Sequence, residues 1–210
     1  MTDNPIEIIH SPKPTLLAID IGNTRVAVAA MHDGLPVMPL SAPTSRPDEI
    51  ANLLDAAWRL VDPDNRAVAI ASVAPESLKT IRAMIQDRLE MNPLVIREDI
   101  ELPMEMAIEN PDTVGVDRIC CAAAAYQVIQ GACTVVDLGT AATIDCVNDD
   151  GVFLGGAILP GLELAARSLD LHTAALPLVE FAVPETVIGR NTQQAIRGGI
   201  YSGLGVGTGS

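Results

Sequence analysis

The feature that most constrains the fold of this chain is a short motif that occurs twice. An apolar run ending in Asp-x-Gly leads into a small polar turn and a second apolar run, first around Asp20 and again around Asp137. This pattern predicts a strand, a tight turn and a returning strand. A repeated unit indicates a duplicated architecture, so we expect two similar lobes that face each other across a cleft.

The rest of the chain alternates between strand patterns and helix patterns. Apolar residues at helical spacing predict a helix over 45–61, and a continuous apolar run predicts a central strand over 67–73. Strands alternating with helices indicate an α/β layer structure. Further helices are expected after Pro75 to Leu89, over 115–129, from 161 to 171 and from Asn191, and further strands near Val37, over 94–96 and over 152–159.

Three regions are expected along the chain. Residues 1–14 are polar and contain proline, which indicates a short flexible extension and not an export signal. The first lobe is expected over 15–114 and the second over 115–210. Less chain follows the second motif than separates the two motifs, and residues 203–210 are Gly-rich. We therefore expect a flexible tail and a second lobe that is incomplete at its C-terminal end.

Composition excludes several classes of partner and site. The net charge is −14 and aromatic residues make up 2% of the chain, so nucleic acid and anionic membrane surfaces are not expected partners. No run of 18 apolar residues predicts a membrane span. The four cysteines form no C-x-x-C pair and the three histidines are far apart, so we expect buried free thiols in a reducing cytosol and no zinc site.

The two Asp-x-Gly turns carry the first candidate chemistry. Glycine lets the backbone approach a ligand closely, so the amides of Gly22, Asn23 and Thr24 can donate to phosphate oxygens. Asp20 can hold Mg²⁺ directly or through water. The second turn, with Asp137, supplies the other half of a clamp on a triphosphate. Ordinary hairpins also contain Asp-x-Gly, so a purely structural pair of turns stays open as the alternative.

The segment Gly115-Val116-Asp117-Arg118 opens a predicted helix. Asp117 can accept the proton of a substrate hydroxyl, and the Arg118 guanidinium can bind a substrate carboxylate. The alternative is structural, with Asp117 favouring the helix N-terminus and Arg118 forming a surface ion pair.

Two further segments contain small residues that allow the backbone to pass close to a ligand or to another part of the chain. Gly155-Gly156 and Pro160-Gly161 allow either a ligand approach or tight backbone packing. Asn191 is expected to cap the last helix, with Thr192 or Arg190 facing the cleft as the alternative.

Taken together, these motifs resemble the type III pantothenate kinase family from about Leu16 to Gly203. The motifs that carry the resemblance are DIGNTRVA at 20–27, ENPDTVGVDR at 109–118, DLGTAATID at 137–145, GGAILPGL at 155–162, TAALP at 173–177 and IGRNTQQAIRGGI at 188–200.

The resemblance implies a fold and an activity. The fold would be two ribonuclease-H-like lobes of the actin-like ATPase architecture, in a cytoplasmic homodimer. The activity would be ATP-dependent phosphorylation of pantothenate to 4'-phosphopantothenate, the first step of coenzyme A biosynthesis. Mg²⁺ would accompany ATP, and a monovalent cation, K⁺ or NH₄⁺, would be required.

The resemblance also implies a role for individual residues. Asp117 would be the proton acceptor, and Asp137 would bind the monovalent cation. Thr140 and the first loop would contact ATP, and Thr192 would touch pantothenate together with the segment around Asp117. The implied ATP loop comprises Asp20, Ile21, Gly22, Asn23, Thr24, Arg25, Val26 and Ala27, and the implied pantothenate residues are Gly115, Val116, Asp117, Arg118 and Thr192.

Two departures from the family pattern motivate other hypotheses. Ile108 stands where the family has a Tyr that contacts pantothenate, and the Gly-rich segment that holds adenosine in the family lies beyond the end of this chain. One alternative is therefore a regulatory relative that binds ligand without turnover. Another is a different actin-like phosphotransferase, such as a polyphosphate hydrolase or a sugar kinase.

Overall fold

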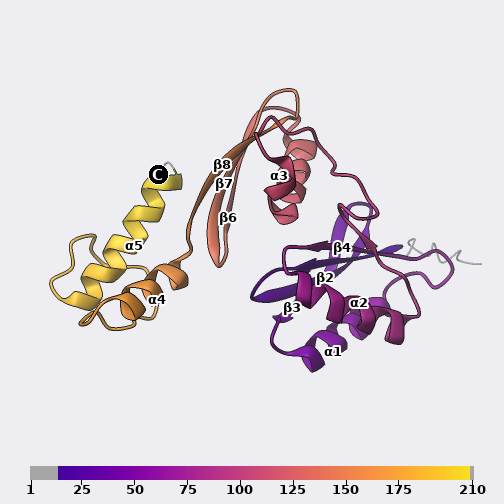
Figure 1. Cartoon of the computed structure of the whole chain (residues 1–210), viewed down its shortest axis with the longest axis horizontal. Coiled ribbons are helices and arrows are strands. Elements are labelled where there is room, and N and C mark those ends of the chain that lie inside the picture. The colour runs from indigo at the N-terminus through magenta and orange to yellow at the C-terminus, as the bar shows by residue number, and fades with distance from the viewer. Residues whose placement is uncertain (1–13, 209–210) are drawn as a thin grey trace, which may run out of the picture. The chain divides into compact units, whose positions relative to one another are not determined.

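The computed structural model describes residues 14–208 (Figure 1). The chain divides into two compact units, unit 1 over Met1–Glu101 and unit 2 over Leu102–Ser210. The expected flexible extension at 1–14 falls almost wholly on residues 1–13, which lie outside the described residues.

Unit 1 contains a five-stranded sheet in the order β3-β2-β1-β4-β5. Strands β1, β2 and β3 form an antiparallel meander. Strand β4 pairs parallel with β1, and β5 pairs parallel with β4. This order, with a three-stranded antiparallel meander beside a parallel part, is that of a ribonuclease-H-like sheet. The strands are β1 Leu16–Ile21, β2 Arg25–His32, β3 Leu35–Pro43, β4 Ala67–Ser72 and β5 Leu94–Val95.

Two helices complete unit 1, α1 over Pro47–Trp58 and α2 over Pro75–Leu89. Each begins with proline in its first turn, where the missing N–H has no helical partner to lose. Each helix buries an apolar stripe in the same core as the sheet. The burial of this apolar area stabilises the packing of the helices on the sheet. The stripes are Ile50, Leu54 and Ala57 on α1 and Ile81, Ile85 and Leu89 on α2.

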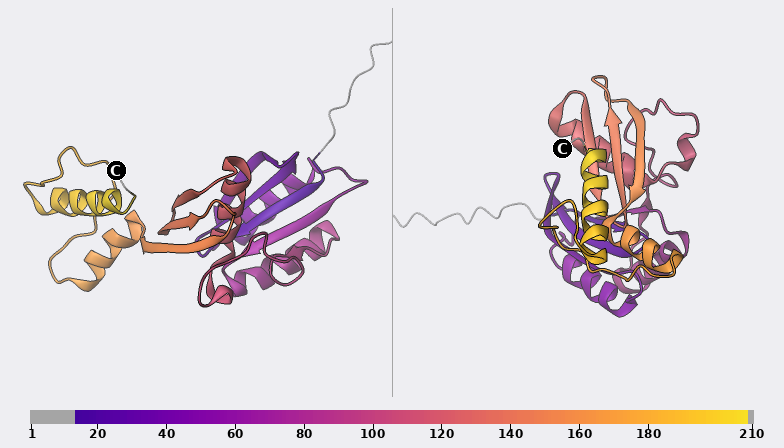
Figure 2. Two further views of the ribbon diagram at one scale, coloured as in Figure 1. Left: turned by 90° about the horizontal axis from the view of Figure 1, so that it is seen from above. Right: turned by 90° about the vertical axis from the view of Figure 1, so that its left-hand side faces the viewer.

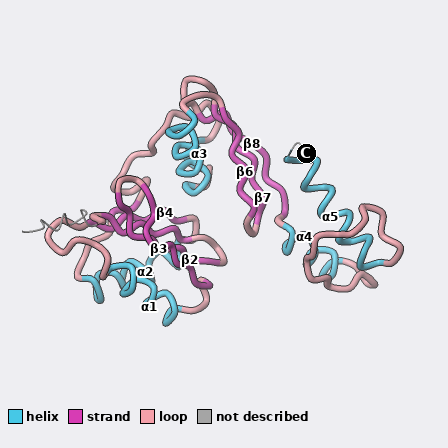
Figure 3. Tube along the Cα trace, turned by 180° about the vertical axis from the view of Figure 1, so that it is seen from behind, coloured by secondary structure: helices cyan, strands magenta, loops and turns pink. Residues whose placement is uncertain are grey.

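Unit 2 contains a three-stranded antiparallel sheet in the order β6-β7-β8 (Figure 3). Helix α3 packs against β6 and β7, and α4 packs against α5, as Figures 1 and 2 also show. The elements are the 3₁₀ turn η1 Pro111–Thr113, α3 Val116–Ile129, β6 Cys133–Leu138, β7 Ala141–Val147, β8 Phe153–Pro160, α4 Leu162–His172 and α5 Thr192–Thr208.

Seven of the buried residues of unit 2 form two small clusters. One lies between α3 and the sheet and consists of Ile119, Ala122, Val147 and Phe153. The other, Ala166, Val179 and Ile196, joins α4 to α5 and the segment between them. The seventeen buried residues of the core cluster in unit 1 make a much larger core.

The predicted α/β class, the two hairpins and the order of helices and strands are confirmed. Two expectations were wrong. Residues 203–208 continue helix α5 instead of forming a flexible tail, because each residue added to an existing helix gains a hydrogen bond that offsets the cost of glycine. The cysteines are not buried: Cys121 is exposed and the other three are half-buried.

No helix among residues 14–208 is long and apolar enough to cross a membrane.

Candidate active site

The first turn, defined as residues 20–25, joins β1 to β2. Asp20 pairs with Ala27 across the hairpin, and the Gly22 amide donates to the Arg25 carbonyl oxygen at 2.9 Å. Thr44 holds the turn from the end of β3, since its amide donates to the Thr24 carbonyl oxygen at 2.9 Å and its hydroxyl to that of Gly22 at 3.3 Å. The local sequence therefore closes the turn, and β3 supports it.

The residues of the expected ATP loop fall into two groups by burial. Ile21 and Val26 are fully buried, so their side chains belong to the core and only their backbone could meet a nucleotide. Gly22 is half-buried, and the other members are exposed: Asp20, Asn23, Thr24, Arg25 and Ala27.

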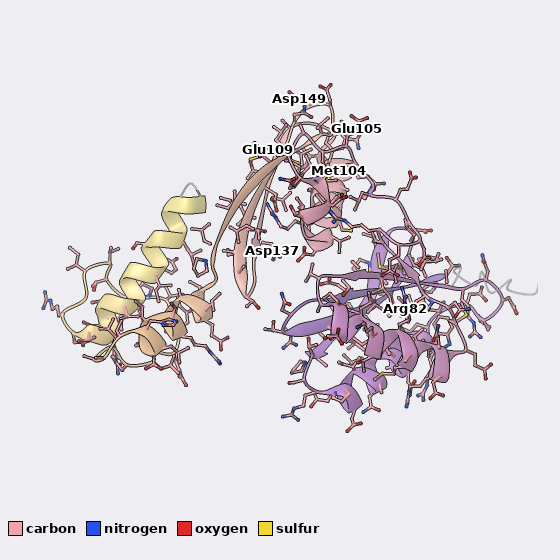
Figure 4. The ribbon with its side chains drawn as sticks, viewed as in Figure 1. Arg82, Met104, Glu105, Glu109, Asp137 and Asp149 are labelled. Atoms are coloured by element: carbon pink, nitrogen blue, oxygen red, sulfur yellow. The ribbon has the colours of Figure 1, made fainter. Side chains whose placement is uncertain are left out.

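The second turn, defined as residues 137–141, joins β6 to β7. Asp137 pairs with Thr143, and the Gly139 amide donates to the Ala141 carbonyl oxygen at 3.0 Å. Asp137 is exposed and lies toward the turn end of the hairpin (Figure 4). Thr140 is exposed, and its carbonyl oxygen accepts a hydrogen bond from the Gly161 amide at 3.0 Å. The segment that starts α4 thus supports the second turn from one side.

The glycines around the second turn serve different purposes. A Cβ on Gly161 would overlap the Gly139 carbonyl oxygen and lie 2.6 Å from that of Thr140, so glycine is required there by packing. A Cβ on Gly139 itself would meet nothing closer than the Ala141 carbonyl oxygen at 3.6 Å, an ordinary contact. Packing therefore does not demand glycine at 139, which leaves room for a ligand as a reason for it.

The segment Gly115–Arg118 begins helix α3 in unit 2. Gly115 is the N-cap residue, and the side chain of Val116 is buried in the unit. Asp117 lies in the first turn, half-buried, with its Oδ1 accepting from the Arg118 amide at 2.8 Å. A carboxylate at this position is stabilised by the helix N-terminus.

Arg118 forms an ion pair with Asp145, a partner that the sequence pattern did not indicate. Its Nε donates to both carboxylate oxygens of Asp145, at 3.0 and 3.1 Å, and its Nη2 also donates to Oδ1 of Asp145. The side chain of Arg118 is 15% exposed and that of Asp145 is 2% exposed. We expected an ion pair at the surface, and this location was wrong, because the pair is buried between α3 and β7. Whether Arg118 also binds a substrate carboxylate stays a prediction.

The Gly155-Gly156 segment lies against this ion pair. Gly156 pairs with Asp145 across β7 and β8, and a Cβ on Gly156 would lie 2.7 Å from Oδ1 of Asp145 and overlap the Ile144 carbonyl oxygen. The alternative that small residues here allow tight backbone packing is confirmed for Gly156. The signal that could have identified Asp145 is a carboxylate within an apolar strand, two residues before the buried Val147.

Thr192 begins helix α5 and is exposed. The preceding Asn191 caps the helix, because its Oδ1 accepts from the Gln194 amide at 2.9 Å, which confirms the expected cap. Within residues 14–208, Thr192 shares no hydrogen bond or ion pair with Asp117 or Arg118. Its expected role in substrate binding stays a prediction.

The chemistry of Asp20 and Asp137 fits hard cations. Both are exposed carboxylates at strand ends, and carboxylate oxygen is the ligand that Mg²⁺ and similar cations prefer. In the described part of the chain, no three His, Cys, Asp or Glu side chains gather as a metal-binding group. A cation at either turn would therefore need backbone oxygens, water or nucleotide phosphates among its ligands.

The family model and the similar curated proteins point to the same family. The model of the type III pantothenate kinase family matches residues 16–207. A type III pantothenate kinase of Rhodospirillum rubrum is 36% identical over 197 residues, which is 90% of this chain and 76% of that protein. One of Sulfurihydrogenibium sp. is 34% identical over 194 residues, 90% of this chain and 77% of that protein. Among solved structures, the activator of the 2-hydroxyisocaproyl-CoA dehydratase from Clostridium difficile, with bound ADPNP, aligns with 12% identity and a TM-score of 0.43, covering 91% of this chain and 66% of that one.

Proposed function

The chain belongs to the type III pantothenate kinase family, and we propose that it transfers the terminal phosphoryl group of ATP to the primary hydroxyl of pantothenate. The product is 4'-phosphopantothenate, which enters coenzyme A biosynthesis. The observation that carries the proposal is the match over residues 16–207, which includes both Asp-x-Gly turns and the Gly115–Arg118 segment.

The reaction needs a proton acceptor and an oriented substrate. The hydroxyl oxygen of pantothenate attacks the terminal phosphorus, the bond from that phosphorus to the bridging oxygen breaks, and ADP leaves. Asp117 accepts the hydroxyl proton. Its place in the first turn of α3, half-buried, supports this role, since the helix N-terminus interacts favourably with a carboxylate there.

Positioning and electrostatics supply most of the catalysis in phosphoryl transfer. In this proposal Gly115, Val116 and Thr192 contact pantothenate, and Arg118 binds its carboxylate. The Gly22 amide donates within the first turn, so the amides of Asn23 and Thr24 and the polar side chains of that turn bind the phosphates. Thr140 of the second turn contacts ATP. The absence of a packing reason for glycine at 139 supports a ligand at the second turn.

Two cations are part of the proposal. Asp20 would hold Mg²⁺ directly or through water, and the cation would supply positive charge to offset that of the ATP phosphates. Asp137 would bind a monovalent cation, K⁺ or NH₄⁺. The exposed carboxylates at the two strand ends support both assignments.

A cytoplasmic homodimer completes the proposal. Both features rest on membership of the family. Light scattering coupled to size-exclusion chromatography measures the mass directly, and a monomer at micromolar concentration would contradict the dimer.

The test is a coupled assay of ADP release with pantothenate, ATP, Mg²⁺ and K⁺. We expect turnover that depends on pantothenate, and we expect Asp117→Asn to lower kcat by about 10²- to 10⁴-fold. Asp48→Asn is the matched control, because Asp48 is also an acid in the first turn of a helix. Asp48→Asn removes the same helix-terminal charge outside the proposed site and is expected to leave kcat unchanged.

Omission controls separate the parts of the proposal. Replacing K⁺ by Na⁺ is expected to lower kcat if Asp137 binds the monovalent cation. ADP release that is independent of pantothenate would reject the kinase assignment, and binding of pantothenate by calorimetry without turnover would favour a regulatory role.

A further inference from the structure

Resting on the proposed function, we propose that Asp145 is a positioning residue that fixes the guanidinium of Arg118 for the carboxylate of the substrate. Asp145 acts through orientation, because it contacts Arg118, and Arg118 in turn contacts pantothenate in the proposed function.

The geometry of the pair is that of a bidentate clamp. Nε and Nη2 lie on one edge of the guanidinium, and the Asp145 carboxylate engages that edge with both oxygens. Such planar, two-point contacts define the orientation of both groups as well as their distance. Arg118 comes from α3 and Asp145 from β7, so the clamp also fixes the first turn of the helix to the sheet.

Further contacts restrict the two side chains on other sides. The Phe153 ring lies under the guanidinium, with its centroid 5.8 Å from Cζ of Arg118. Gly156 borders the carboxylate so closely that a Cβ there would lie 2.7 Å from Oδ1 of Asp145. Asp145 therefore has little freedom to rotate, and its hydrogen bonds to Arg118 restrict the guanidinium as well.

The clamp leaves a defined set of donors for a ligand. A guanidinium has five N–H donors, and Asp145 engages the Nε and Nη2 edge. Nη1 lies on the other side of the group and can pair with a second carboxylate, together with the remaining hydrogen of Nη2. Asp117, the proposed proton acceptor, precedes Arg118 directly, so an error in the position of the bound carboxylate would misplace the hydroxyl as well.

Stability alone does not account for a pair of this kind. Burying two charges costs desolvation energy that their attraction only partly offsets, and apolar residues of similar volume often serve as well. Asp145 is 2% exposed and lies in a strand of otherwise apolar or small residues. Its placement beside the proposed substrate segment is explained by a requirement for orientation.

The experiment compares wild type, Asp145→Asn, Arg118→Ala and the double variant by calorimetry. The ligands are pantothenate and the alcohol in which a hydroxymethyl group replaces its carboxylate. We expect Asp145→Asn to raise the Kd for pantothenate by about tenfold or more, while the Kd values for the alcohol and for ATP stay unchanged. In the Arg118→Ala background, Asp145→Asn should change the Kd for pantothenate by less than about twofold, because the two residues act as one unit.

A structural role predicts other results. If Asp145 only stabilises the fold, Asp145→Asn lowers the Tm but leaves the Kd for pantothenate unchanged, or weakens the acid and the alcohol equally, and the proposal is overturned. Arg118→Lys separates charge from orientation, because Lys keeps the charge but cannot form the bidentate clamp. We expect its Kd for pantothenate to resemble that of Asp145→Asn, and a wild-type Kd would count against positioning.

A second measurement applies even if Asp145→Asn does not fold. The Hε proton of Arg118 in ¹⁵N-labelled wild-type protein should exchange slowly with solvent, because Asp145 holds it in a buried hydrogen bond. Fast exchange, similar to that of the exposed Arg46, would overturn the proposal. Wild type that binds no pantothenate would instead reject the proposed function, and the Hε exchange would still decide whether Asp145 fixes Arg118.

Discussion

Ile21 in the first hairpin and Leu138 in the second occupy the same place, one residue after the aspartate of the repeated motif. Ile21 is 0% exposed, whereas Leu138 is 65% exposed. Ile19 and Val136, which directly precede the two aspartates, differ in the same way, at 3% and 42%. The strands are similar in sequence and in their antiparallel pairing across the hairpin, so their own residues do not explain the difference.

The neighbours of each strand explain it. β1 lies between β2 and β4, and the helices α1 and α2 share its core. β6 pairs with β7 alone among the described strands, and α3 packs beside it. The comparison teaches that a local motif determines a turn, while the elements packed around a strand decide how much stability its apolar residues contribute.

The largest expected effect compares Ile21→Ala with Leu138→Ala. Ile21→Ala should lower the free energy of unfolding by about 2–5 kcal/mol, because it leaves a cavity in the core of unit 1. Leu138→Ala should lower it by less than about 0.5 kcal/mol, as expected for a surface position. Urea unfolding separates the units, since the single tryptophan, Trp58, lies in unit 1 and both tyrosines, Tyr126 and Tyr201, lie in unit 2. Equal losses would show that Leu138 is covered in solution and would break the comparison.

The second prediction concerns the close approach of Gly156 to Ile144 and Asp145 in unit 2. Gly156→Ala should destabilise unit 2 by about 3 kcal/mol, because the new Cβ overlaps the Ile144 carbonyl oxygen and displaces Asp145. Gly34→Ala is the control in unit 1. Gly34 has a φ of +77° but nothing within 4 Å of a Cβ, so only backbone strain of about 1–2 kcal/mol is expected. Thermal unfolding followed by tyrosine circular dichroism for unit 2 and by Trp58 fluorescence for unit 1 tests both, and a wild-type Tm for Gly156→Ala would contradict the packing.

The third prediction compares the two turns as candidate phosphate-binding turns. Gly139→Ala should change stability by less than about 0.5 kcal/mol, since its Cβ makes an ordinary contact. It should raise the KM for ATP by about tenfold, equivalent to about 1.4 kcal/mol, if phosphate oxygens approach the second turn. Gly22→Ala probes the first turn, where a Cβ would lie 3.2 Å from the Arg25 carbonyl oxygen. A KM for ATP that changes in only one variant would show that the two turns do not act alike.

The smallest effect contrasts an exposed ion pair with the buried one. The hydrogen bond from Arg88 lowers the pKa of Asp55 from its ordinary value of 3.8. A depressed pKa in the folded state means that the contribution to stability is present above the unfolded pKa and is lost as pH falls through the folded pKa. The Tm difference between wild type and Asp55→Asn should therefore be small near neutral pH and disappear as the pH falls from 3.8 through the folded pKa. A difference that grows in acid would contradict the direction of the shift.

The sequence by itself determined the local structure of this protein. The prolines at Pro47 and Pro75 mark helix starts, Asn191 caps the last helix, and the Asp-x-Gly motifs produce two hairpins with turns held by Gly22 and Gly139. These features depend on backbone dihedral angles and hydrogen bonds within a few residues, which local residue types specify. The repeat and the motif order also sufficed to identify the family.

Only the tertiary structure decided which side chains are buried and which meet across the chain. Asp145 reaches Arg118 from 27 residues away, and nothing local to either residue specifies that contact. Ile21 and Leu138 follow the same motif but differ in burial, because burial depends on which strands and helices pack against each hairpin. Burial and distant ion pairs are properties of the packed elements together, so a single segment read alone does not determine them.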